Sequence, residues 1–407
     1  MEQHRQTDLF VNSLLACLFT LFLVFQLFVP TTGTSIFTIL THPALLQTDY
    51  FELGGLAPTF FNSSVLFLIV IGFIKFNRQA YTGKIVGYLF LLLGFSLFGK
   101  NPLNALPLLL GHQLYIFKHP KQTSSAVANA IVSTALGPML SVLYFHFQLQ
   151  WLLVLLIGLG TGYLFTPLAE RVRKTHGGLT LYNGGLTAGF IAVVANTLLR
   201  LSGNQLSPYQ LNTQNFPILL VIMAAFSFLL LIIGWVKKPS SITFNKESLD
   251  YLFDYGLYYC FYNMGLIGLM LSFFLWGSGA PINGISIGSA ISVIGFGCYG
   301  KRPYDLLVLM TSAFVGLWLQ GIQVQSATFV SIVVFSSALA PVVHRYPLPV
   351  AITAGLLHAL VAPQASFFQG YMNLYNSGFT SGVVAIIIYT IDQIRFRLIR
   401  KEKHQPN

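Results

Sequence analysis

The 407-residue sequence has very little charge: only 8% of its residues are Asp, Glu, Lys or Arg, against roughly 25% in soluble domains. Hydrophobic residues make up 55% of the chain. A soluble fold of this length needs far more polar surface, so the composition argues against that class. A membrane-spanning helix needs about 20 apolar residues, and a chain this apolar is expected to cross the bilayer many times.

Signatures of common enzymes and metal sites are also missing. The sequence has no HExxH, GxSxG or Walker phosphate-binding pattern. Its three cysteines, Cys17, Cys260 and Cys298, lie in or beside apolar segments without CxxC or Cys/His spacing. We interpret them as small hydrophobic residues and not as disulfides or metal ligands. We therefore expect no enzyme activity, no cofactor and no metal.

Basic residues outnumber acidic ones by 22 to 11. A positive charge of this size is also found in nucleic-acid-binding proteins. Here, however, Lys and Arg stand in short loops between apolar segments, which is the pattern of cytoplasmic loops in membrane proteins. We predict the lipid bilayer as partner, and no nucleic acid.

Fourteen apolar segments can be counted along the chain. In the first half they cover approximately 10–29, 58–76, 84–99, 103–117, 124–147, 150–168 and 180–200. In the second half they cover approximately 215–236, 256–276, 284–299, 303–319, 325–343, 347–363 and 375–394. Segments three and four of each half are short and separated by a Gly-Lys-x-Pro break. Each such pair is either two spans or one re-entrant hairpin.

The two halves of the sequence are related by a repeat. Four elements of the first half return in the same order about 200 residues later. They are 99–104 with 300–305, 133–138 with 336–341, 181–190 with 374–383, and Asn62 with Asn263. The sequence therefore predicts an all-α membrane protein with two transmembrane repeats, 1–205 and 206–407, each with about seven apolar segments.

The distribution of basic residues predicts how these repeats are oriented. Six loops contain no Lys or Arg, and the basic clusters alternate with them. The loops are 30–57, 148–150, 201–214, 277–283, 320–324 and 364–374. With both termini in the cytoplasm of a bacterial plasma membrane, the clusters fall inside and these loops outside. Each half then crosses an odd number of times, so the second repeat is inverted, as in secondary transporters and some channels.

The Gly-Lys-x-Pro element is the first candidate for a solute site. Pro102 and Pro303 suit the first turn of a helix, so each is expected to begin a half-helix inside the membrane. Such an N-terminus attracts anions or carbonyl oxygens, and Lys100 and Lys301 would add to this attraction. The alternative is a plain turn between helices with a lysine at the membrane surface.

A repeated Leu-Tyr-Asn-x-Gly-x-Thr-x-Gly element is the second candidate. Its tyrosine, asparagine and threonine side chains offer hydroxyl and amide groups, with Asn and Thr one helical turn apart. These residues are Tyr182, Asn183 and Thr187 in the first half, and Tyr375, Asn376 and Thr380 in the second. We expect them around a site at the middle of the membrane. The alternative is helix packing alone, with the asparagine as a cap.

Charged and ionisable residues within apolar segments are rare and are functional candidates by default. Asp305 follows Pro303 where the first half has Asn104, and it suits either a solute site or a helix N-terminus. His112 and His358 lie inside apolar segments. We interpret each as a packing histidine, with a proton relay as the alternative.

Two resemblances follow from these motifs. The repeated Leu-Tyr-Asn-x-Gly-x-Thr-x-Gly unit resembles an uncharacterised bacterial membrane family defined only as a repeated domain of unknown function, over most of the chain. More weakly, Asn101-Pro102 and the Leu-Tyr-Asn elements are similar to motifs of urea transporters, whose inverted halves line a central pore. This sequence lacks the inner Gly-Tyr of that motif and has Arg302 where asparagine would stand. The second resemblance implies an architecture and no substrate.

The sequence thus supports the hypothesis of a permease or channel for a small polar or anionic solute, bound between inverted repeats. A non-conducting scaffold or partner subunit is the alternative, an intramembrane enzyme is the weakest, and a homo-oligomer stays open. The candidate solute-binding residues are Lys100, Asn101, Pro102, Asn104, Tyr182, Asn183, Thr187, Lys301, Pro303, Asp305, Tyr375, Asn376 and Thr380.

Overall fold

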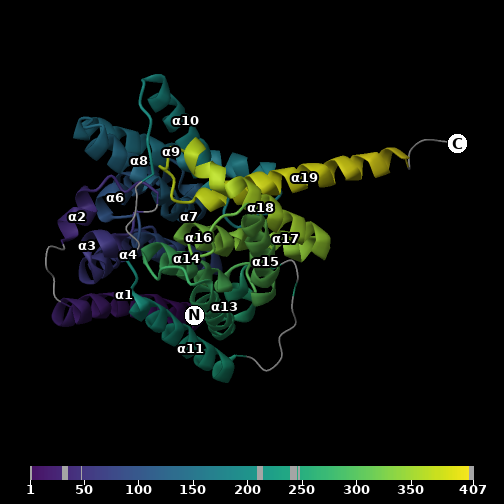
Figure 1. The fold of residues 1–407 in the computed structure, drawn as a ribbon, viewed down its shortest axis with the longest axis horizontal. Helices are drawn as coiled ribbons and strands as arrows, with labels where there is room; N and C mark the ends of the chain where they lie inside the picture. Colours follow the sequence, from purple (N-terminus) through teal and green to yellow (C-terminus); the bar gives the residue numbers. More distant parts are fainter. Residues whose placement is uncertain are drawn as a thin grey trace.

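A computed structural model describes residues 2–29, 35–46, 48–208, 214–238, 245 and 248–402. The loops 30–57 and 201–214 lie partly outside these ranges. The described residues form helices and no strands (Figure 1). The first half contains α1 (Glu2–Phe28), α2 (Ile36–Thr41), α3 (Tyr50–Gly54), α4 (Leu56–Phe76), α5 (Gly83–Ser96), α6 (Pro102–Lys118), α7 (Thr123–Ser133), α8 (Gly137–Ser141), α9 (Trp151–Thr175) and α10 (Asn183–Leu201).

The second half repeats this order of helices. It contains α11 (Pro217–Lys237), α12 (Tyr251–Tyr255), α13 (Leu257–Ser278), α14 (Gly284–Ile294), α15 (Pro303–Leu319), α16 (Ala327–Phe335), α17 (Ala340–Arg345), α18 (Leu348–Phe368) and α19 (Asn376–Glu402). A long first helix, a short helix before the second span, two short apolar helices and three further spans recur in the same order. The two-repeat all-α architecture predicted from the sequence is confirmed.

Ten stretches of the described chain are long and apolar enough to cross a membrane. They are α1, α4, Pro120–His146, α9, α10, α11, α13, Ala327–Arg345, α18 and α19. Five belong to each half. Because five is odd, the second half starts from the side opposite to the first, and the repeats are inverted.

The remaining short helices form re-entrant hairpins. With 14 and 17 residues, α5 and α6 are about 21 and 26 Å long, less than the roughly 30 Å of a hydrocarbon core. Asn77, just after α4, donates from its side-chain nitrogen to Oε1 of Gln113 near the end of α6, at 2.8 Å. The end of α6 therefore lies on the side where α4 ends and α5 begins. This contact decides between the two alternatives for segments three and four.

The second hairpin, α14–α15, enters from the other side. Gly277 and Ser278, at the end of α13, line the same cavity as Val324, which lies in the loop after α15. The hairpin therefore starts and ends where α13 ends. We call the side of α4's end the N-terminal side, because α1 begins there, and the other the opposite side.

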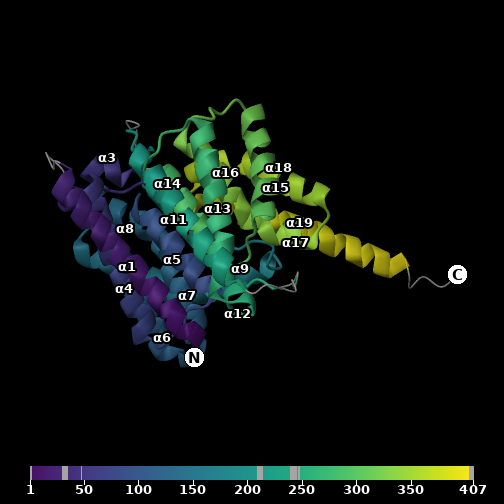
Figure 2. The ribbon, with the colours of Figure 1, turned by 90° about the horizontal axis from the view of Figure 1, so that it is seen from below.

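Basic residues gather on the N-terminal side. The last turns of α4, α6, α9, α11 and α17 all end there and all contain Lys, Arg or His. Arg200, at the end of α10, is an exception on the opposite side. α1 and α11 lie at one edge of the molecule, and α10 packs against α19 at the other, with α19 extending beyond the remaining helices (Figures 1 and 2).

The halves meet along two helix pairs, α5 with α14 and α10 with α19. Glycine residues allow the helix backbones to approach closely in both pairs. A Cβ on Gly94 would lie 2.0 Å from the carbonyl oxygen of Gly288, and one on Gly185 would lie 2.7 Å from Cα of Gly378. Backbones that approach this closely place the tips of both hairpins within the interface between the halves.

Candidate functional site

Each hairpin tip is held inside the membrane by an asparagine of a spanning helix. Asn62 on α4 donates to the carbonyl oxygens of Ser96 and Lys100, at 2.8 and 2.9 Å. Asn263 on α13 donates to the carbonyls of Gly297 and Lys301, both at 2.8 Å. Broken backbone at membrane depth needs such partners. The repeated Asn62/Asn263 pair, noticed in the sequence without a role, therefore supports the tips.

The two lysines at the tips reach across to the other half. Lys100 Nζ donates to the hydroxyl oxygen of Tyr375, and Lys301 Nζ donates to that of Tyr182 at 2.7 Å. Lys301 also donates to Oγ of Ser337 at 2.8 Å. Both lysines are 0% exposed. Each ammonium group also lies over the ring of its tyrosine, 4.3 and 4.5 Å from the centroid, which is favourable for a cation.

Neither buried lysine forms an ion pair with an acidic side chain among the described residues, although Lys301 lies close enough to Asp305 to interact with its charge. Asp305 forms an ion pair with Arg302 and a 2.8 Å contact with His344 Nε2. An ammonium group buried without a counter-charge loses several kcal/mol of hydration that hydroxyl groups recover only in part. A bound anion would therefore stabilise the tip lysines.

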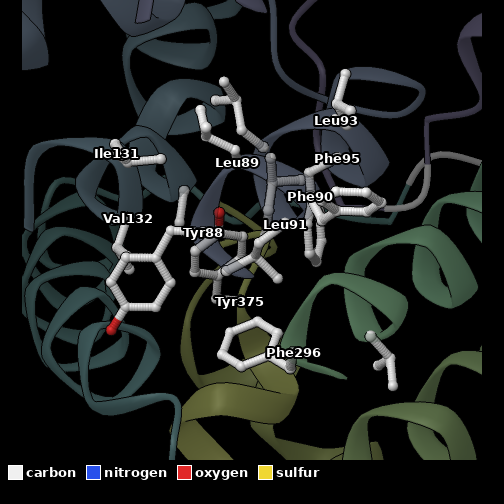
Figure 3. Close-up of a cluster of buried hydrophobic side chains, with 14 of the residues drawn as sticks. Tyr88, Leu89, Phe90, Leu91, Leu93, Phe95, Ile131, Val132, Phe296 and Tyr375 are labelled. Atoms are coloured by element: carbon white, nitrogen blue, oxygen red, sulfur yellow. The ribbon is translucent and has the colours of Figure 1, made fainter. Parts of the chain in front are cut away.

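An aromatic layer separates the two lysine–tyrosine pairs. The ring of Tyr375 lies 4.7 Å from that of Phe95, which stacks on Phe335 at 5.5 Å. Phe335 lies 6.2 Å from Tyr182, and Tyr182 lies 4.9 Å from Phe296. Figure 3 shows Phe95, Tyr375 and Phe296 within a cluster of buried side chains. In this conformation the centre of the interface is closed.

A small cavity of about 40 Å³ with a mixed apolar and polar lining borders this layer. Phe95 and Phe335 form part of its wall, together with five polar side chains. These are Thr328, Ser331, Ser366, Asn376 and Ser377. The cavity also touches Ile285 in the first turn of α14, so it lies toward the opposite side. It is large enough for a water molecule or a very small solute.

The other predicted tip residues form helix caps. Asn101 and Asn104 exchange two 3.0 Å hydrogen bonds between side chain and backbone, and Pro102 is the first residue of α6. Pro303 begins α15 in the same way, and Asp305 accepts from the backbone nitrogen of Arg302 at 2.9 Å. These residues shape the tips without themselves lining the cavity.

The repeated asparagines and threonines are occupied within their own halves. Asn183 donates to the carbonyl of Ala169 on α9 at 2.9 Å, and Asn376 donates to Oγ of Ser366 on α18 at 3.0 Å. Thr187 and Thr380 donate to the carbonyls one turn earlier, at 3.1 and 3.3 Å. The structure thus brings the tyrosines of this element together with the lysines, while the asparagines tie neighbouring helices. Their role in solute binding stays a prediction.

Two aspartates connect each half to the other's hairpin. Asp49 caps α3 at Phe51 and accepts from the backbone nitrogen of Gly284, where α14 begins, at 3.1 Å. Asp250 caps α12 and accepts from the backbone nitrogen of Gly83, where α5 begins, at 3.0 Å. Burial raises the pKa of Asp49 from 3.8 to about 6. Sequence reasoning missed Asp49, although it precedes Asp250 by the same interval as Lys100 precedes Lys301.

His112 lies away from the tips. Its Nδ1 is 3.0 Å from the carbonyl oxygen of Leu108, and its ring packs near Phe165 of α9. This supports the packing interpretation.

Among the described residues, no group of three or more His, Cys, Asp or Glu side chains could hold a metal ion.

A family model matches most of the chain. The model described as "Protein of unknown function (DUF1576)" covers residues 30–201 and 236–394. The two segments correspond closely to the two repeats. No curated protein and no solved structure is significantly similar to the chain.

Proposed function

The chain belongs to the DUF1576 family, a family of unknown function, and we propose that it is a permease for a small anionic or polar solute. The solute would bind between the hairpin tips, at the Lys100–Tyr375 and Lys301–Tyr182 pairs. The observation that carries this proposal is the presence of two fully buried lysines that form no ion pair among the described residues. Ionisable groups inside a bilayer typically mark a solute or ion pathway.

The charge of the tips favours an anion over a neutral solute. Two ammonium groups and the first turns of α6 and α15 all direct positive potential into the interface. The Coulomb attraction of an anion placed there would offset part of the hydration free energy that the lysines lose on burial. Each tyrosine hydroxyl now accepts a hydrogen bond from its lysine. It could instead donate a hydrogen bond to the solute, because a phenol hydroxyl does both.

The aromatic layer favours a carrier over an open channel. Phe95, Phe335 and Tyr182 close the interface, while the small cavity borders Phe95 from the opposite side. Transport would therefore need rearrangement of one half against the other around the tips, as in alternating access. We place both termini in the cytoplasm of a bacterial plasma membrane, because the basic helix ends gather on the N-terminal side.

The proposal can be tested with purified protein in liposomes. Swelling is recorded in isosmotic potassium nitrate, formate or acetate with valinomycin, and in urea or glycerol. We expect faster swelling than in empty liposomes for at least one anion. Lys100→Met and Lys301→Met should each slow it on the order of tenfold or more, since a hydrogen bond to a buried charge is lost. Lys75→Met, at an exposed lysine of α4, is the matched control.

A non-conducting scaffold or partner subunit is the second candidate. The close packing of the aromatic layer favours it, because an interface without a continuous polar path conducts nothing in this state. Swelling equal to that of empty liposomes in all five solutes, with wild-type protein, would support the scaffold. Wild-type swelling that both lysine variants retain would remove the tip site and leave the transport activity without a location.

A further inference from the structure

The second hairpin tip contains an ionisable cluster that the first tip lacks. Asp305 Oδ2 accepts from His344 Nε2 at 2.8 Å, and Oδ1 accepts from Arg302 Nη2 at 3.1 Å. The side chains of Asp305 and His344 are 0% and 3% exposed. In the first half the corresponding residues are Asn104 and Ser141, joined by a 3.1 Å hydrogen bond. Neither of these residues changes its charge with pH.

The groups around His344 leave this cluster with a net positive charge. Lys301 and Arg302 stand at the tip, and the carboxylate of Asp305 is the acidic group in contact with the imidazole. Two phenols, Tyr251 on α12 and Tyr259 on α13, interact electrostatically with Arg302 and Asp305. They are neutral at ordinary pH.

The neighbouring helices add little charge around His344. Within α18 the only ionisable residue is His358, about three turns along the helix. On α19, Asp392 accepts from the hydroxyl of Tyr346 at 3.1 Å. Arg345, next to His344, is exposed and donates to the carbonyl of Gly177. The charge of the buried cluster is therefore set by Lys301, Arg302, Asp305 and the protonation state of His344.

We propose that His344 is a proton-binding site coupled to anion binding at Lys301. Nε2–H of the imidazole stays hydrogen-bonded to Asp305, and the proton adds to Nδ1, so that no bond to Asp305 is broken. The cluster then gains one positive charge beside the tip of the second hairpin. An anion at Lys301 is stabilised by that charge, because Coulomb energies are large where water is excluded.

Thermodynamic linkage makes this coupling reciprocal. If a proton on His344 increases anion affinity by some factor, a bound anion must increase the proton affinity of His344 by the same factor. The inference rests on the proposed solute site, and it adds that the anion would be taken up together with a proton. The first tip has no equivalent group, so one proton site serves the pair of tips.

The experiment follows the imidazole ¹⁵N signals of the full chain in lipid nanodiscs from about pH 4.5 to pH 8.5. His344→Gln assigns the signal of His344. The titration is run in potassium nitrate and in potassium gluconate, a bulky anion, at equal ionic strength. We expect a one-proton titration of His344 whose proton affinity is higher in nitrate, on the order of tenfold. Lys301→Met should abolish the nitrate effect while the titration itself remains.

Two variants separate local effects from coupling. Asp305→Asn removes the acidic partner and should lower the proton affinity of His344 in both salts. His358→Gln removes another buried histidine and should change neither the titration nor its response to nitrate. A His344 signal that keeps one protonation state throughout, or that titrates identically in both salts, overturns the inference. Because no flux is measured, a failure to transport solute in liposomes would leave this result unaffected, and the two proposals can fail separately.

Discussion

The two hairpin tips have the same backbone and different charges. At the first tip, Asn101, Asn104 and Ser141 form a neutral network of amide and hydroxyl groups. At the second, ionic tip, Arg302, Asp305 and His344 occupy the matching positions. Both sets cap the helix that follows the tip. The first tip therefore shows that the fold does not need charged residues at these three positions, which points to a different reason for the ionic set.

The largest expected difference between the tips is in stability. Asp305→Ala leaves His344 and Arg302 without their carboxylate, and breaking a buried pair costs about 3–5 kcal/mol. Asn104→Ala removes a neutral cap, which costs about 1–2 kcal/mol. Thermal unfolding of both variants in detergent should therefore show the larger drop in Tm for Asp305→Ala. Equal drops would mean that the ion pair is only another way of capping the helix.

The aspartates that contact the hairpin entrances extend the comparison to pH. The pKa of Asp49 is about 6 instead of 3.8, because burial disfavours its charge. The folded protein thus holds this proton more tightly than the unfolded chain. The contribution of Asp49 to the free energy of unfolding is largest below pH 4. It falls as the pH rises to about 6 and is constant above pH 6. A shift of about two pKa units corresponds to about 3 kcal/mol.

Asp49→Asn should remove that pH dependence. Tm is measured from pH 4 to pH 7, and the difference between wild type and variant should change most between pH 4 and pH 6. Asp250→Asn is the matched variant at the other hairpin. Its pKa is raised by the same cause, but the residue is only half-buried, so its effect should be smaller. Parallel curves for wild type and Asp49→Asn would show that Asp49 does not titrate in this range.

The smallest expected difference concerns the second partner of one lysine. Lys301 donates to Ser337 as well as to Tyr182, whereas the residue matching Ser337, Thr134, donates to the carbonyl of Ile131. Ser337→Ala should cost about 1.5–3 kcal/mol, because a hydrogen bond to a charged group is lost. Thr134→Val should cost less, and swelling assays should show the same order. The reverse order would place the more important lysine in the first tip.

Much of the architecture could be predicted from the sequence, because it depends on averages and local patterns. Hydrophobic composition placed the chain in the membrane, and the repeated elements around Lys100 and Lys301 indicated two halves. Pro102 and Pro303 correctly marked where α6 and α15 begin. Asn183 is a candidate for the site by its repeated motif, yet its amide contacts α9 of its own half. A side chain's partner depends on which helix lies beside it, and the motif contains no such information.

The sequence by itself determined a membrane protein with two inverted repeats, since charge counts and an interval of about 200 residues are visible without coordinates. Only the tertiary structure decided that the short segments turn back as hairpins and that each tip lysine meets the tyrosine of the other half. Lys100 and Tyr375 are 275 residues apart, and Lys301 and Tyr182 are 119 apart. Contacts over such separations arise from packing of α5 on α14 and α10 on α19, which local sequence patterns do not specify.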